Sequence, residues 1–171
     1  MRPRLFPFLI AAVVIILDRV TKNVIRAHVS PVDSLTVIPG LFNIVHTENP
    51  GIAFGMLSSA TGAWRDVLLI GFSAAVLIAI STVLLRPASQ LSAWLRAALG
   101  LILGGAAGNL YDRIVNGTVT DFVELHAGQH YFAAFNVADS AVTIGACLLL
   151  LDMWRARERK VSHVSEANIN R

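Results

Sequence analysis

Five acidic residues lie at or near the ends of apolar segments, and they are the first candidates for chemistry: Asp18, Asp112, Asp121, Glu124 and Asp139. A carboxylate in or near lipid is costly, so each one needs a partner or a function. Asp18 and Lys22 are four residues apart with the acid first, which favours an ion pair on one helix face. Asp112 adjoins Arg113, whose guanidinium is a fork for carboxylates or backbone carbonyls. We interpret both pairs as structural.

Asp121 and Asp139 differ from the other acids, because neither has a basic residue within four positions. Asp139 opens an apolar helix and Asp121 follows a predicted turn, so we expect both at one membrane depth. Two carboxylates placed together can share one proton, and such a pair activates water in aspartic proteases. Spacing alone leaves two interpretations open, a catalytic pair or scattered interfacial acids.

Other reactive arrangements are weaker. His126 and His130 have the spacing of a zinc-binding helix, but the segment contains Gly128 and lacks the glutamate of that motif. There is no GxSxG motif, and Ser140 has no histidine near it in the chain. We therefore predict no metal site, no cofactor and no serine-peptidase chemistry.

The composition indicates a membrane protein. Of 171 residues, 55% are apolar and 15% are charged, and the mean hydropathy is +0.64. Soluble domains carry about 25% charged residues. The net charge of +3 comes from basic residues gathered beside apolar segments, so we predict no nucleic-acid partner. The single cysteine excludes a disulfide scaffold.

Four apolar segments are predicted to form membrane-spanning helices, at about 5–28, 67–85, 95–114 and 136–154. A helix needs about 20 apolar residues to cross the hydrocarbon core. The first segment resembles a signal peptide, but no small-x-small cleavage site follows it. We interpret it as an uncleaved helix with a polar outer third. The third segment is rich in small residues, which allow close helix contact, and we interpret Gly104, Gly105 and Gly108 as packing positions rather than substrate contacts.

The basic residues predict the topology. Segments 1–4, 86–96 and 155–171 hold nine of the fourteen Lys and Arg residues, whereas 29–64 and 115–135 hold none. Cytoplasmic loops carry the excess of positive charge. We therefore expect four crossings, with both termini in the cytoplasm.

The two segments without basic residues are predicted to form a small β-rich extracytoplasmic cap. Runs 35–38 and 41–46 are β-prone and are joined at Pro39-Gly40. Residues 114–119 surround Asn116-Gly117, a strong hairpin signal. We thus expect a mainly α, four-transmembrane-helix bundle with this cap, as a single membrane-embedded domain over 1–160. Residues 161–171 are expected to be a disordered cytoplasmic tail.

Five blocks in the chain resemble a known family when they are read in order: DRVTK at 18–22, NPGIAF at 49–54, GGAAGNLYDR at 104–113, VTDF at 119–122 and FNVAD at 135–139. The pattern resembles lipoprotein signal peptidase (signal peptidase II), a family of bacterial membrane aspartic peptidases, over about 10–155. The resemblance implies four transmembrane helices and the catalytic residues Asp121 and Asp139. It also suggests residues that order the site or bind substrate: Asp18, Lys22, Asn49, Gly51, Asn109, Asp112, Arg113 and Asn136.

The resemblance further implies an activity and a place. The expected substrate is a prolipoprotein carrying diacylglycerol on a cysteine, and the expected reaction is cleavage just before that cysteine. The enzyme is expected to be a monomer in the bacterial inner membrane, in contact with lipid, with its site near the outer face. Two other classes compete: a transport subunit whose carboxylates relay protons, and a scaffold protein that binds partners through its cap.

Overall fold

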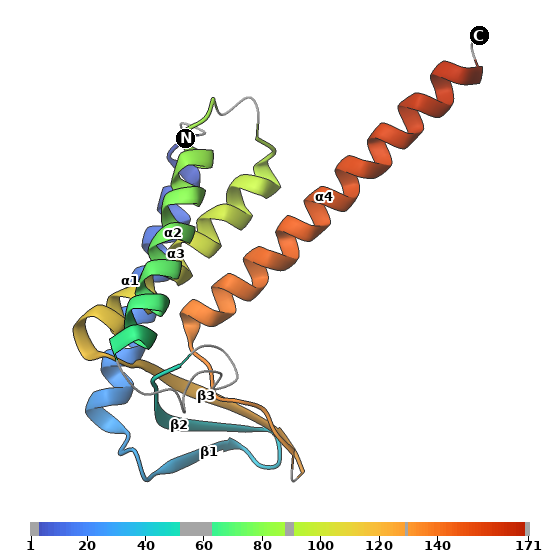
Figure 1. Cartoon of the computed structure of the whole chain (residues 1–171). Helices are drawn as coiled ribbons and strands as arrows, with labels where there is room; N and C mark the ends of the chain where they lie inside the picture. Colours follow the sequence, from blue (N-terminus) through green and yellow to red (C-terminus); the bar gives the residue numbers. More distant parts are fainter. Residues whose placement is uncertain (1–3, 52–62, 88–90, 129, 170–171) are drawn as a thin grey trace.

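The computed structural model describes residues 4–51, 63–87, 91–128 and 130–169. Its elements in chain order are α1 (Phe6–His28), β1 (Ser34–Ile38), β2 (Phe42–Asn49), α2 (Ala63–Leu84), α3 (Ala93–Asn116), β3 (Val119–Ala127), β4 (His130–Tyr131) and α4 (Val137–Ile169). The strands gather at one end of the long helices (Figure 1). Helix α3 is central, because α1, α2 and α4 all pack against it.

Small residues on α3 allow its neighbours to approach closely. An added Cβ at Gly104 would lie 2.8 Å from the carbonyl oxygen of Ala11 on α1. A Cβ at Gly105 would overlap the carbonyl of Ala138 on α4. Helices in lipid associate largely through such van der Waals packing. The interpretation of these glycines as packing positions is confirmed.

The predicted count of four apolar spans is not confirmed. Among the described residues, three helical stretches are long and apolar enough to cross a membrane, at Trp64–Leu84, Ala93–Asn116 and Val137–Glu158. Helix α1 has 23 residues, but Asp18, Arg19 and Lys22 all fall within its second half. Three charged side chains so close together are more than a purely apolar span carries.

The four strands form one antiparallel sheet in the order β1-β2-β3-β4. The predicted pairing of β1 with β2 is confirmed, and Gly40 between them has a φ of +77°. The predicted hairpin at Asn116-Gly117 is wrong. Helix α3 continues to Asn116, and Gly117 ends it in the left-handed conformation while donating its N–H to the Arg113 carbonyl. Asn-Gly suits a helix C-terminus as well as a tight turn, because both need a positive φ.

Helix α4 is longer than predicted. It runs from Val137 to Ile169, whereas the sequence predicted an end at 154. The tail predicted to be disordered is therefore helical as far as Ile169. Residues 155–169 contain no glycine or proline, so no helix-breaking residue stops α4 where the apolar segment ends.

Candidate active site

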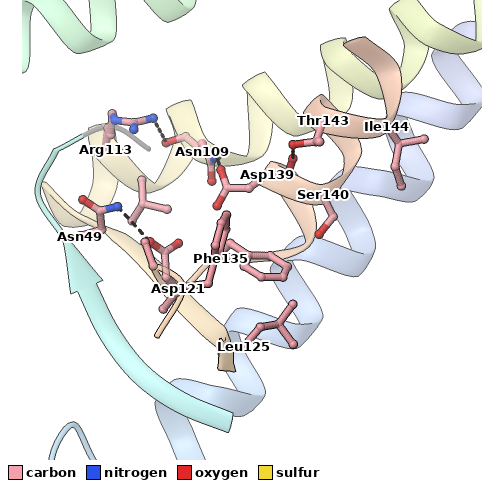
Figure 2. A pocket seen from close by; sticks show the side chains of 14 residues that line it. Asn49, Asn109, Arg113, Asp121, Leu125, Phe135, Asp139, Ser140, Thr143 and Ile144 are labelled. Atoms are coloured by element: carbon pink, nitrogen blue, oxygen red, sulfur yellow. Dashed lines mark hydrogen bonds between the residues drawn. The ribbon is translucent and has the colours of Figure 1, made fainter. Parts of the chain in front are cut away.

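A pocket of about 470 Å³ lies where the sheet meets the ends of α3 and α4. Figure 2 shows Asp121 on β3 and Asp139 on α4 facing this space. Its other lining residues are Asn49, Asn109, Arg113, Val119, Leu125, Phe132, Ala133, Ala134, Phe135, Ser140, Thr143 and Ile144. Asn49, Asn109, Arg113, Asp121 and Asp139 form its polar end, and Ser140 and Thr143 interrupt an otherwise apolar lining. The pocket can therefore orient a ligand through hydrogen bonds and bury an apolar portion of it.

Strand β3 places Asp121 in the pocket wall, and two amides hold its carboxylate. Asn136 Nδ2 donates to Oδ1 at 2.7 Å, and Asn49 Nδ2 donates to Oδ2 at 2.9 Å. Asp121 is only 2% exposed. Burial raises its pKa to about 6, and the nearby carboxylate of Asp139 adds to the rise, whereas the two amide hydrogen bonds oppose it. Asp121 therefore changes protonation near neutral pH.

The first turn of α4 fixes Asp139. Asn136 precedes the helix, and its side-chain oxygen accepts the Asp139 N–H at 2.9 Å. The Asp139 carboxylate in turn accepts the Asn136 N–H at 3.2 Å, so the two residues form a reciprocal capping box. Asn109 Nδ2 donates to the other carboxylate oxygen at 2.7 Å. Asn136 thus contacts both acids, and it sets their relative position.

Asn49, Gly51 and Arg113 close the polar end of the pocket. The Asn49 side-chain oxygen accepts the Gly51 N–H at 2.9 Å, which leaves its amide NH₂ directed at Asp121. Arg113 donates to the carbonyls of Gly51 and Asn109, at 3.0 and 3.4 Å. Of the two kinds of partner predicted for this guanidinium, backbone carbonyls are the ones it contacts.

A buried charge cluster supports the site from α1. The predicted Asp18–Lys22 pair is confirmed at 2.8 Å, and both side chains are fully buried. Lys22 Nζ also lies 2.7 Å from Asp112 and donates to the Asn109 side-chain oxygen at 2.9 Å. Asp18 accepts the N–H of Ala138 in the first turn of α4. The ten predicted site residues therefore belong to one connected network, although their chemical roles stay predictions.

Several supporting residues escaped prediction. Arg19 and Arg26 both donate to Asp112, at 2.6 and 3.0 Å. Together with Lys22 they recur at intervals of three and four residues, which places them on one helix face, so the sequence did contain this signal. The apolar wall formed by Leu125 and Phe132 carried no such signal, because only the folded sheet brings it to the acids.

The raised pKa of Asp121 predicts how stability depends on pH. Its ordinary value is 3.8 and its folded value is about 6, so between these limits the folded state holds a proton that the unfolded state has released. The contribution of Asp121 to the free energy of unfolding therefore decreases as the pH rises from about 4 to about 6. At about 1.4 kcal/mol per pKa unit, the loss reaches up to about 3 kcal/mol.

Thermal unfolding of the wild type and Asp121→Asn at several pH values checks this. The wild type should lose stability relative to the variant as pH rises from about 4 to 7. Thr143→Ala, a change without a titrating group in the same pocket, should run parallel to the wild type. Parallel curves for Asp121→Asn would contradict the assignment.

The fold and the site together define a class. Helices long enough to span a bilayer and two carboxylates facing one pocket are what a membrane aspartic peptidase requires. Residues 10–155 match the family model described as Signal peptidase (SPase) II. The chain belongs to the signal peptidase II family.

Curated relatives and solved structures agree with this membership. The lipoprotein signal peptidase of Solibacter usitatus is 44% identical over 158 residues, covering 91% of this chain and 94% of its own length. That of Pseudomonas aeruginosa is 43% identical over 150 residues, covering 87% and 88%. A solved structure described as a bacterial membrane enzyme has a TM-score of 0.80 and 33% identity, with 91% of each chain covered. A second has a TM-score of 0.75 and 30% identity, with 86% and 92% covered.

Proposed function

We propose that this chain hydrolyses the peptide bond just before the diacylglyceryl-modified cysteine of a prolipoprotein, with Asp121 and Asp139 as its catalytic pair. Family membership makes the chain a membrane aspartic peptidase that removes signal peptides from prolipoproteins. The observation that carries the finer proposal is the position of both acids on one pocket. Asp121 is buried and Asp139 is partly buried, and the side chain of Asn136 contacts both residues.

The chemistry follows from a shared proton. One aspartate, ionised, takes a proton from water, and the water oxygen attacks the scissile carbonyl carbon. The other aspartate, protonated, hydrogen-bonds the carbonyl oxygen as negative charge develops there. Proton return to the nitrogen then breaks the C–N bond and releases the amine. The reaction needs one proton between the two acids, and we assign that proton to the pair and not to one member.

In this proposal, α1 is a fourth membrane-spanning helix. Its apolar residues Leu9, Val13 and Ile16 are exposed on the helix surface, whereas Asp18 and Lys22 are fully buried. A charged residue in a membrane helix is tolerated when it faces inward and is paired. The exposed face of α1 thus suits lipid despite the charged residues in its second half.

Charge gives the orientation in this proposal. Figure 1 shows the start of α1 and the end of α4 far from the sheet, and the basic segments lie toward those ends. By the positive-inside rule, both termini are cytoplasmic and the pocket faces the outer side of the bacterial inner membrane. One chain supplies both acids, so a monomer suffices.

Three precursors test the proposed specificity: one unlipidated, one with short acyl chains and one with long acyl chains. Each buried CH₂ is worth about 0.8 kcal/mol on transfer from water, but acyl chains lie in lipid both before and after binding. Their length should therefore matter little, and the lipidated cysteine should matter greatly. We expect similar cleavage of both lipidated precursors and almost none of the third, measured by product mass. Equal cleavage of the unlipidated precursor would contradict the proposed specificity.

A further inference from the structure

The back of strand β3, opposite the pocket, carries a polar arrangement that the proposed reaction does not use. Side chains alternate along a strand, so Val119 and Asp121 face the pocket while Thr120 faces away. Thr120 is fully buried and directly precedes Asp121. Whatever holds the Thr120 side chain therefore restrains the backbone that carries the Asp121 carboxylate.

Arg26 of α1 holds Thr120 from behind. Its Nε donates to Thr120 Oγ1 at 2.8 Å, and its Nη2 donates to Asp112 Oδ1 at 3.0 Å. The Thr120 hydroxyl in turn donates a hydrogen bond to Glu48 Oε1, at 2.9 Å. The guanidinium thus joins α1 to α3 and to β3 with two different nitrogens, and the paired strand β2 completes the link through Glu48.

Glu48 is ionised in this arrangement. Burial of Glu48 raises its pKa, but hydrogen bonds from Thr118, His46 and Thr120, together with the charge of Arg26, outweigh burial and hold the pKa below its usual value. Glu48 also pairs directly across the sheet with Thr120. An acceptor with a fixed charge therefore faces Thr120 Oγ1 on one side, and the Arg26 donor faces it on the other.

We propose that Arg26 is a positioning residue for the peptidase reaction, which holds Thr120 and thereby keeps the Asp121 carboxylate in place beside Asp139. The inference rests on the proposed catalytic role of Asp121. Arg26 does not line the pocket, and its contact with the strand that carries Asp121 is made through Thr120. A displacement of about 1 Å in a reacting group can cost about 100-fold in rate, so a contact behind the strand can control turnover.

Other contacts would preserve the fold if the two hydrogen bonds from the Arg26 guanidinium were lost. Asp112 keeps Arg19 at 2.6 Å and Lys22 at 2.7 Å, and Glu48 keeps Thr118 at 2.6 Å. A lysine at position 26 would retain the positive charge, but a single ammonium on a flexible stem lacks the planar fork that binds two acceptors at fixed geometry. Arg26→Lys therefore separates the positioning contact from the charge.

The test compares kcat, KM and thermal stability for Arg26→Lys, Thr120→Val, Thr120→Ser and the double variant Arg26→Lys/Thr120→Val. Valine keeps the branched shape of threonine and removes the hydroxyl, whereas serine keeps the hydroxyl. We expect kcat to fall about 10- to 100-fold in Arg26→Lys and Thr120→Val, with KM and the melting temperature close to wild type. Thr120→Ser should retain most of the activity. The matched control is His28→Ala, an exposed residue on the same helix whose ring contacts the Val24 carbonyl one turn earlier.

The double variant shows whether Arg26 acts through Thr120. If Arg26 acts through Thr120, the double variant should lose no more activity than the worse single variant, since both break one link. Multiplying effects, or wild-type kcat in Arg26→Lys, would overturn the inference. So would a loss that appears only as a lower melting temperature. Asp121→Asn in the same assay distinguishes failure of the proposed function from failure of this inference. Activity in Asp121→Asn would contradict the proposed function. An inactive Asp121→Asn together with a fully active Arg26→Lys would contradict only the inference about Arg26.

Discussion

Asp121→Asn and Asp139→Asn are each expected to abolish cleavage of a lipidated precursor while expression and helical content stay near wild type. An amide can neither take a proton from water nor share one with its neighbour, and general acid–base catalysis is worth about 10²–10⁴-fold. Turnover measured on purified, folded protein should therefore fall by at least that lower factor. A variant with more than about a tenth of wild-type turnover would exclude its aspartate from the chemistry.

The fold should tolerate both substitutions. In Asp139→Asn, the amide oxygen can still accept the Asn136 N–H that closes the capping box. In Asp121→Asn, the variant loses a buried ionisable group whose raised pKa costs stability at neutral pH. Asp33→Asn is the matched control, because Asp33 lies in an exposed turn before β1. It should cleave like the wild type, so that loss of activity reports the pocket.

Local spacing predicted the features that depend on one helix or one hairpin. Asp18 and Lys22 stand one turn apart, so their ion pair was predictable before any tertiary structure was known. Two β-prone runs joined at Pro39-Gly40 predicted the β1–β2 pairing in the same way. The error at Asn116-Gly117 has the same origin. A dipeptide reports the need for a positive φ, but it does not say whether a helix or a strand comes before it.

Contacts between residues far apart in the chain could not be predicted from local spacing. Asp121 and Asp139 are on β3 and α4, and only the family resemblance paired them before the fold was seen. The Arg26–Thr120 contact joins residues 94 positions apart, and neither residue type marks it in the sequence. In helix α1 the sequence pattern suggested a polar outer third, whereas the fold buries two of its charged side chains. Its charges reduce its apolar character in sequence, yet Asp18 and Lys22 are fully buried against α3 and α4 rather than exposed.

Lys22→Met is expected to destabilise the protein strongly and to reduce turnover with it. Lys22 is fully buried, and its ammonium contacts Asp18, Asp112 and Asn109 at 2.7–2.9 Å. Removing one member of a buried ion pair costs about 3–5 kcal/mol, because the remaining charge is left uncompensated. Turnover should fall too, since Asn109 holds Asp139 through its amide. Thermal or denaturant unfolding in detergent measures the first effect, and the cleavage assay measures the second.

Two comparison variants separate charge compensation from substrate binding. Arg19→Gln should cost less than Lys22→Met, because Arg19 is partly exposed and Asp112 keeps Lys22 and Arg26 when it is removed. Adding Asp18→Asn to Lys22→Met removes one of the uncompensated carboxylates, so the double variant should recover part of the lost stability. If Lys22→Met instead kept wild-type stability and raised only KM, Lys22 would belong to the substrate site. Its complete burial between two carboxylates argues for compensation, because no face of the ammonium is open to the pocket.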